Sequence, residues 1–102
     1  VLTTTDSRDE ARSISAALVE LGLAACAQIS EIESVYEWQG EIKHDTEFRL
    51  FVKTTARRYD AVERAIRERH SYDLPAIYAI DLDRVYAPYA DWVAANSGNG
   101  GS

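Results

Sequence analysis

The spacing of hydrophobic residues predicts that the chain begins with a strand and then a helix. The segment 1–5 is short and rich in apolar and β-branched residues, as expected of a buried strand. Ser7 and Glu10 have the spacing of a capping box, in which the Ser7 hydroxyl accepts from a first-turn amide and the Glu10 carboxylate reaches back. Apolar residues then recur at helical spacing as far as Gly22, which is a natural helix stop.

The middle of the chain has the pattern of one long β-hairpin. Residues 24–38 alternate as a strand, with a change of parity near 30–31 that predicts a bulge or bend. After a turn at Gly40, residues 41–53 alternate between an apolar and a charged face, and Phe51 interrupts the charged one. Such a strand reaches about 43 Å, beyond the diameter of a compact domain of this size. The hairpin is therefore expected to project and to need sister subunits to cover it.

The second half of the chain predicts two more helices with a strand between them. Thr55 is placed to cap an amphipathic helix, and Pro75 prevents that helix from continuing. Apolar and polar residues alternate over 76–83, as in a strand, and Pro88 opens a short terminal helix. Together with the first half, this gives the βαββαβ order of the α+β ferredoxin-like sandwich, followed by a C-terminal helix.

Length and composition fit one domain. The chain has 102 residues, of which 46% are hydrophobic, and this supplies a single modest core. We therefore expect residues 1–96 to form one ferredoxin-like domain. The glycine- and serine-rich segment 97–102 is expected to be a flexible tail.

Charge and cysteine content narrow the possible partners. A net charge of −6 repels phosphate backbones and anionic lipid, so neither nucleic acid nor a membrane is an expected partner. No segment has the length of a membrane span or the pattern of a signal peptide. The single cysteine rules out a disulfide within the chain and a C-x-x-C motif. These features favour a cytoplasmic location.

Five short motifs follow one another in an order that is hard to attribute to chance. They are Leu23-Ala24-Ala25-Cys26-Ala27, Tyr36-Glu37-Trp38-Gln39-Gly40-Glu41, Lys53-Thr54-Thr55, His70-Ser71-Tyr72-Asp73-Leu74-Pro75 and Tyr89-Ala90-Asp91-Trp92. Together they resemble the CutA family of divalent-ion tolerance proteins, over about residues 2–93. The resemblance implies a ferredoxin-like subunit, a tightly packed homotrimer in the bacterial cytoplasm, and a role in tolerance of copper and other divalent cations.

Two residues are candidate metal ligands, Cys26 and His70. A thiolate and an imidazole suit Cu(I) or Zn(II), so copper or another divalent cation is the expected ion, although no cofactor is obligatory. Cys26 lies among alanines and could instead pack as a small hydrophobe, and His70 could cap the end of its helix. Relatives suggested to bind copper have a thiol in the first strand and two adjacent histidines. This chain has Thr3 and Arg69-His70 there, so that full set is missing.

A second set of residues could line a cleft between subunits, because it combines aromatic rings with charged groups. Its members are Tyr36, Trp38, Lys53, Tyr72, Asp73 and Trp92. The alternative is that they only pack at the interface. Such a cleft favours a second hypothesis, a regulatory trimer like the PII signalling proteins. It would grip a small, partly flat anionic ligand with Lys53, Arg49, Trp38 and Tyr72. No catalytic constellation is visible, so an enzyme is not expected.

Overall fold

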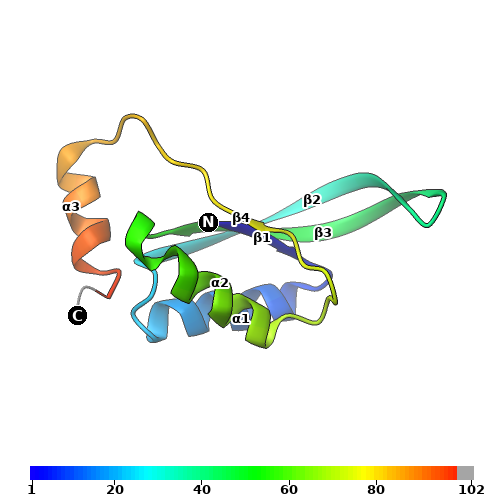
Figure 1. Ribbon diagram of the computed structural model, residues 1–102, viewed down its shortest axis with the longest axis horizontal. Coiled ribbons are helices and arrows are strands. Elements are labelled where there is room, and N and C mark those ends of the chain that lie inside the picture. Colours follow the sequence, from blue (N-terminus) through cyan, green and yellow to red (C-terminus); the bar gives the residue numbers. More distant parts are fainter. Residues whose placement is uncertain (99–102) are drawn as a thin grey trace.

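The computed structural model describes residues 1–98 and shows a four-stranded antiparallel sheet with two helices on one face (Figure 1). The elements in chain order are β1 (Leu2–Thr5), α1 (Arg8–Glu20), β2 (Cys26–Trp38), β3 (Glu41–Lys53), the 3-10 turn η1 (Ala56–Arg58), α2 (Tyr59–Arg69), β4 (Ile77–Tyr78) and α3 (Ala87–Ala95). The strand order in the sheet is β2-β3-β1-β4. This arrangement confirms the predicted α+β ferredoxin-like fold with a long hairpin and a C-terminal helix.

Helix α1 starts where the sequence predicted, but only half of the capping box forms. The Ser7 hydroxyl accepts from the Glu10 amide at 3.1 Å, as expected. The Glu10 carboxylate does not reach back. Instead, it accepts from the backbone N–H and the hydroxyl of Ser71 at 2.7 and 2.8 Å. That half of the prediction is wrong because Ser71 offers two donors at once, and the result ties α1 to the loop after α2.

The core lies between the two helices and the face of the sheet that they cover. Apolar residues four apart on α1 and α2 form one buried cluster with two residues of β3. The helix residues are Ile14, Leu18, Val62 and Ile66, and the β3 residues are Leu50 and Val52. The end of the described chain also packs. Ser97 is buried, and its carbonyl accepts from Arg58 Nε at 2.8 Å. The rest of the predicted tail, 99–102, lies outside the described residues.

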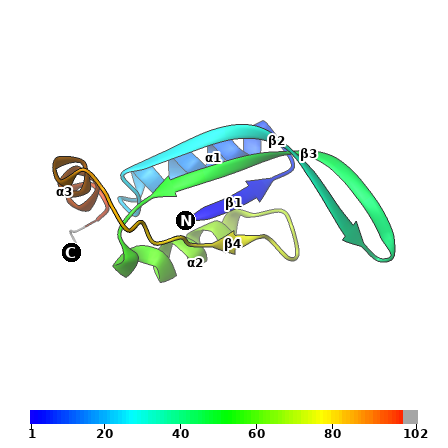
Figure 2. The same ribbon diagram turned by 90° about the horizontal axis from the view of Figure 1, so that it is seen from above.

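The hairpin pairs without interruption from Cys26 opposite Lys53 to Trp38 opposite Glu41. Both residues of its turn, Gln39 and Gly40, have positive φ, as in the two-residue turns that favour hairpins. The principal extents of 45 × 28 × 20 Å agree with a projecting ribbon (Figure 2).

The predicted bulge near residues 30–31 is absent, and the ribbon curves instead (Figure 2). The change of parity in the sequence has a different cause. Ile29 pairs with the buried Leu50 and faces the helices, whereas Tyr36 and Trp38 lie on the opposite face. The hydrophobic side of the ribbon switches because the ribbon leaves the helical layer.

The predicted strand over 76–83 is much shorter than expected. Only Ile77 and Tyr78 pair with β1, opposite Thr3 and Leu2. The pairing with β1 ends at Tyr78, and residues 79–86 form an extended arm that leads to α3 (Figure 1). Large apolar side chains of this arm are exposed, among them Ile80 and Leu82.

Candidate functional site on the open sheet face

One face of the sheet has no helix over it, and we call it the open face. The register places on it the side chains that alternate with the buried Leu50 and Val52. They include Cys26, Ile32, Tyr36 and Trp38 of β2, Glu47, Arg49, Phe51 and Lys53 of β3, and Tyr78 of β4. Phe51 and Tyr78 are 37% and 49% exposed, so apolar surface remains uncovered at the centre of the sheet.

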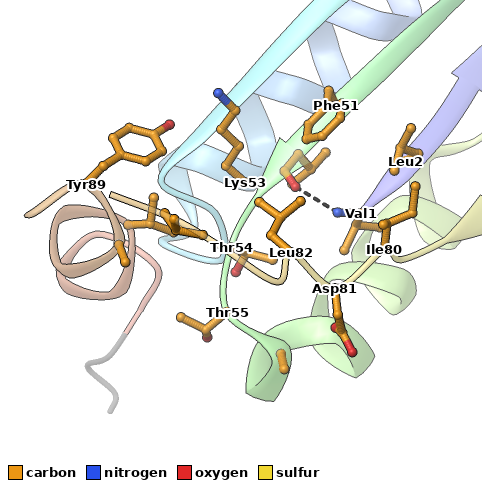
Figure 3. Close-up of a pocket in the computed structure, with 15 residues that line it drawn as sticks. Val1, Leu2, Phe51, Lys53, Thr54, Thr55, Ile80, Asp81, Leu82 and Tyr89 are labelled. Carbon is orange, nitrogen blue, oxygen red and sulfur yellow. Dashed lines mark hydrogen bonds between the residues drawn. The ribbon is translucent and has the colours of Figure 1, made fainter. Parts of the chain in front are cut away.

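The first of two hollows on this face lies where the arm and α3 pass the end of β3 (Figure 3). It encloses about 620 Å³, and we call it the Lys53 hollow. Its walls are mainly apolar, and the charged side chains in its lining are Lys53 and Asp81. The Lys53 ammonium lies 5.4 Å from the centre of the Tyr89 ring, within the range of a cation–π contact. The Tyr89 ring therefore contacts one side of the Lys53 ammonium.

The second hollow lies between the hairpin and the loop that follows α2. It encloses about 650 Å³, and we call it the aromatic groove. Its lining residues are Thr4, Ser34, Val35, Tyr36, Trp38, Glu47, Tyr72, Asp73, Leu74, Ala76 and Tyr78. Four of these are aromatic and two are carboxylates, while Lys, Arg and His are missing from the lining. The groove is therefore both apolar and acidic.

Tyrosine hydroxyls and carboxylates pair within and beside the aromatic groove. The Tyr72 hydroxyl donates to Glu47 Oε2 at 2.9 Å, and the Tyr36 hydroxyl donates to Asp45 Oδ2 at 2.5 Å. Burial and the hydrogen bond to Glu47 raise the pKa of Tyr72, and the hydrogen bond to Asp45 is the main cause that raises the pKa of Tyr36. Both phenols are thus held in the protonated state, in which they act as donors.

We expect Tyr72 to ionise at higher pH than an ordinary tyrosine. Its pKa is raised above 10.0 in the folded protein, so the folded state binds this proton more tightly than the unfolded state does. The contribution to stability is complete below pH 10 and disappears as pH rises through the folded pKa. Because the pKa values of Tyr36 and Tyr59 are also raised, the measurement compares amplitudes: the late part of a phenolate absorbance titration should be smaller in Tyr72→Phe than in the parent, and Tyr86→Phe, at an exposed position, serves as control. A late amplitude that is undiminished in Tyr72→Phe would contradict the assignment.

The structure brings together four of the six predicted cleft residues. Tyr36, Trp38, Tyr72 and Asp73 line the aromatic groove. Lys53 lies in the other hollow, and Trp92 stacks on Tyr89 within α3, with ring centres 5.8 Å apart. Sequence reasoning missed Glu47 and Tyr78. Glu47 lies on the same face of the hairpin as Tyr36, because Tyr36 pairs with Lys43 and Glu47 is four residues further along β3. This pairing is the signal that could have identified it.

The two candidate metal ligands lie apart. Cys26 is a partly buried residue at the beginning of β2, on the open face beside Lys53. His70 contacts Thr4 of β1, and Thr4 pairs with Arg49 of β3. Arg49 also pairs with Ser30 of β2, and Ser30 is four residues from Cys26 along that strand. This spacing corresponds to about 13 Å along a strand. Within residues 1–98, no group of three or more His, Cys, Asp or Glu could hold a metal ion.

His70 makes structural contacts with both ring nitrogens. Nε2 donates to the Thr4 carbonyl at 2.7 Å, and Nδ1 accepts from the Tyr72 amide at 3.1 Å, which assigns the tautomer of the neutral ring. Nδ1 is also 3.5 Å from a Glu10 oxygen, an ion pair only when the ring is protonated. The side chain has no exposed surface. A metal would therefore have to displace a backbone partner from this imidazole.

The fold and the open face define the class of protein, a ferredoxin-like α+β domain with the Lys53 hollow and the aromatic groove on the uncovered side of its sheet. The family model described as CutA1 divalent ion tolerance protein matches residues 1–96, and the chain belongs to this CutA family. A divalent-cation tolerance protein CutA from Thermus thermophilus is 39% identical over 99 residues, which are 96% of each chain.

Solved structures agree with this assignment. The CutA1 structure from Thermus thermophilus has a TM-score of 0.90 and covers 95% of both chains at 39% identity. The structure described as periplasmic CutA from Archaeoglobus fulgidus has a TM-score of 0.88 and covers 90% of both at 37% identity. The PII-like protein CutA from Nostoc sp. PCC 7120 has a TM-score of 0.88 at 28% identity and covers 94% of this chain and 93% of its own. Among residues 1–98, no helix has the length and apolarity needed to traverse a bilayer.

Proposed function

We propose that this protein acts in the tolerance of divalent cations as a homotrimer in which the open faces cover one another. The observation that carries the proposal is the apolar surface that one chain leaves uncovered, at Phe51 and Tyr78 on the sheet and at Ile80 and Leu82 on the arm. Contiguous apolar surface of this kind marks an interaction site, and a second copy is the commonest partner. The number three comes from the resemblance to the CutA family.

Sedimentation equilibrium tests the assembly directly. The expected mass is three times the 11.4 kDa of one chain, and it should persist at micromolar concentration. A stable monomer at that concentration would overturn the proposal. We also propose a cytoplasmic location, which the lone Cys26 supports because secreted proteins of this size commonly depend on disulfides.

Metal binding, with copper as one of the ions, is proposed at positions shared between subunits. A single chain lacks a ligand cluster within residues 1–98, whereas Cys26 lies on the open face, where a neighbouring subunit can add donors. Calorimetric titration with Cu(I), Cu(II) and Zn(II) should show saturable binding that Cys26→Ser weakens and His44→Gln, a change at an exposed hairpin residue, does not. No saturation below about 1 mM, or equal binding by Cys26→Ser, would refute it.

A second candidate is a PII-like regulatory trimer that binds a small ligand between subunits. The aromatic groove favours it, since a concave apolar hollow with a few polar groups is typical of a small-molecule site. This proposal is for binding and not for catalysis, because the Tyr72 phenol and the Glu47 carboxylate of the groove pair with each other and the Tyr36 phenol pairs with Asp45 beside it. The predicted anionic ligand would have to meet Lys53 in the other hollow, since the groove lining has no basic side chain.

A further inference from the structure

We infer that the aromatic groove binds a small organic cation with an apolar body, such as an alkylated ammonium ion. The inference deepens the proposed function and rests on it, because the groove lies on the open face that the trimer brings to a subunit boundary. Three features of the groove carry it: the rings, the sign of the charge and the size.

The rings of the groove come from three separate parts of the chain and remain uncovered. Tyr36 and Trp38 belong to β2, Tyr72 to the loop after α2, and Tyr78 to β4. Tyr36, Trp38 and Tyr78 are 41–49% exposed in a single chain, so the core of their own chain does not use this ring surface, and a ligand held at the subunit boundary can contact it. The face of an aromatic ring attracts a cation, and several rings around one ammonium group are the usual arrangement for alkylated amines.

The charged groups of the groove have one sign. Its charged lining residues are Glu47 and Asp73, and the Tyr72 hydroxyl uses only one Glu47 oxygen, which leaves acceptor positions free. The basic side chains of the open face are directed elsewhere or lie outside the lining. Lys43 pairs with Glu41 at 3.0 Å, and Arg49 is level with Thr4 but is not among the lining residues. An anion in the groove would therefore meet repulsion, and a cation attraction.

The size and the walls select an organic cation over a metal ion. The volume of about 650 Å³ lies within the usual range of small-molecule pockets. Val35, Leu74 and Ala76 form apolar walls that a bare ion cannot use. Hard divalent cations take six or more oxygen ligands, and the two carboxylates of the groove fall short of that number. An alkylated ammonium ion uses both the carboxylates and the walls.

The test compares three probes of the same shape on the full-length protein: choline, its neutral carbon analogue 3,3-dimethylbutan-1-ol, and the anion 3,3-dimethylbutanoate. Tryptophan fluorescence and calorimetry report the binding. We expect saturable binding of choline at least about tenfold tighter than binding of the neutral analogue, and weaker still for the anion. The Kd for choline should rise about tenfold in Glu47→Gln, where charge is lost and shape is kept.

The matched control is Glu33→Gln, which removes a carboxylate from the helix-side face of the same hairpin and should leave the Kd unchanged within about twofold. Equal binding of choline and its neutral analogue, tighter binding of the anion, or a Glu47→Gln variant with unaltered Kd would each overturn the inference. A trimeric mass without choline binding would refute the cation site and leave the trimer intact. A monomeric mass with Glu47-dependent choline binding would support the cation site and refute the trimer.

Discussion

Replacing His70 by alanine is expected to lower the free energy of unfolding by about 3 kcal/mol. The imidazole is completely buried and joins the Thr4 carbonyl of β1 to the Tyr72 amide of the loop after α2. Truncation leaves both backbone groups without a partner and opens a cavity between them. Each unpaired buried group costs about 1–3 kcal/mol, and the cavity adds to this. Urea denaturation at one fixed protein concentration measures the change.

The control for this prediction is His44→Ala, at the exposed histidine of the hairpin, which should change the free energy of unfolding by less than about 0.5 kcal/mol. A His70→Ala variant as stable as the parent, but with weaker copper binding, would contradict the structural role and favour the ligand role. The two roles of His70 are thus separated by one pair of measurements.

The elements of the fold could be predicted because local spacing determines them. The Ser7 cap, the helical stripes and the turn at Gly40 are all signals within a few residues of the chain. The errors arose where the outcome depends on a distant element. The apparent bulge near 30–31 reflects the edge of the helical layer, and β4 is short because only Ile77 and Tyr78 pair with β1. Periodicity alone does not show how far a neighbouring element extends.

The candidate site could be predicted only in part, for the same reason. Residue type and motif selected Tyr36, Trp38 and Tyr72, and the structure places these three side chains along one groove. Lys53 was predicted to be a charged member of the same cleft, but it lies at the end of β3 in the other hollow, beside the arm and α3. Glu47 was missed because a charged position on an alternating strand is usually a solvated one. A two-residue turn fixes the register, and that register places Glu47 on the face of Tyr36.

The largest effect on assembly is expected from Phe51→Lys, which should convert the proposed trimer into monomers. Phe51 is at the centre of the open face, between Gln28 on β2 and Leu2 on β1. Arg49 and Lys53 lie two residues away on the same strand and face, so the change creates a row of three cations. Burying an unpaired charge costs several kcal/mol, and this cost opposes packing of the open faces against one another. The mass by sedimentation should fall to 11.4 kDa at micromolar concentration.

The fold of the subunit should survive this substitution, because Phe51 is 37% exposed in a single chain and a lysine there can reach water. Val19→Lys is the matched control: it places the same new charge on an exposed apolar position of α1, and it should leave the mass trimeric. Tyr78→Lys, on β4, attacks the same face from another strand and should also dissociate the assembly. A trimer that persists in both open-face variants, with circular dichroism unchanged, would show that subunits associate through another surface. Dissociation in both, with Val19→Lys unaffected, requires that the uncovered side of the sheet is where the copies meet.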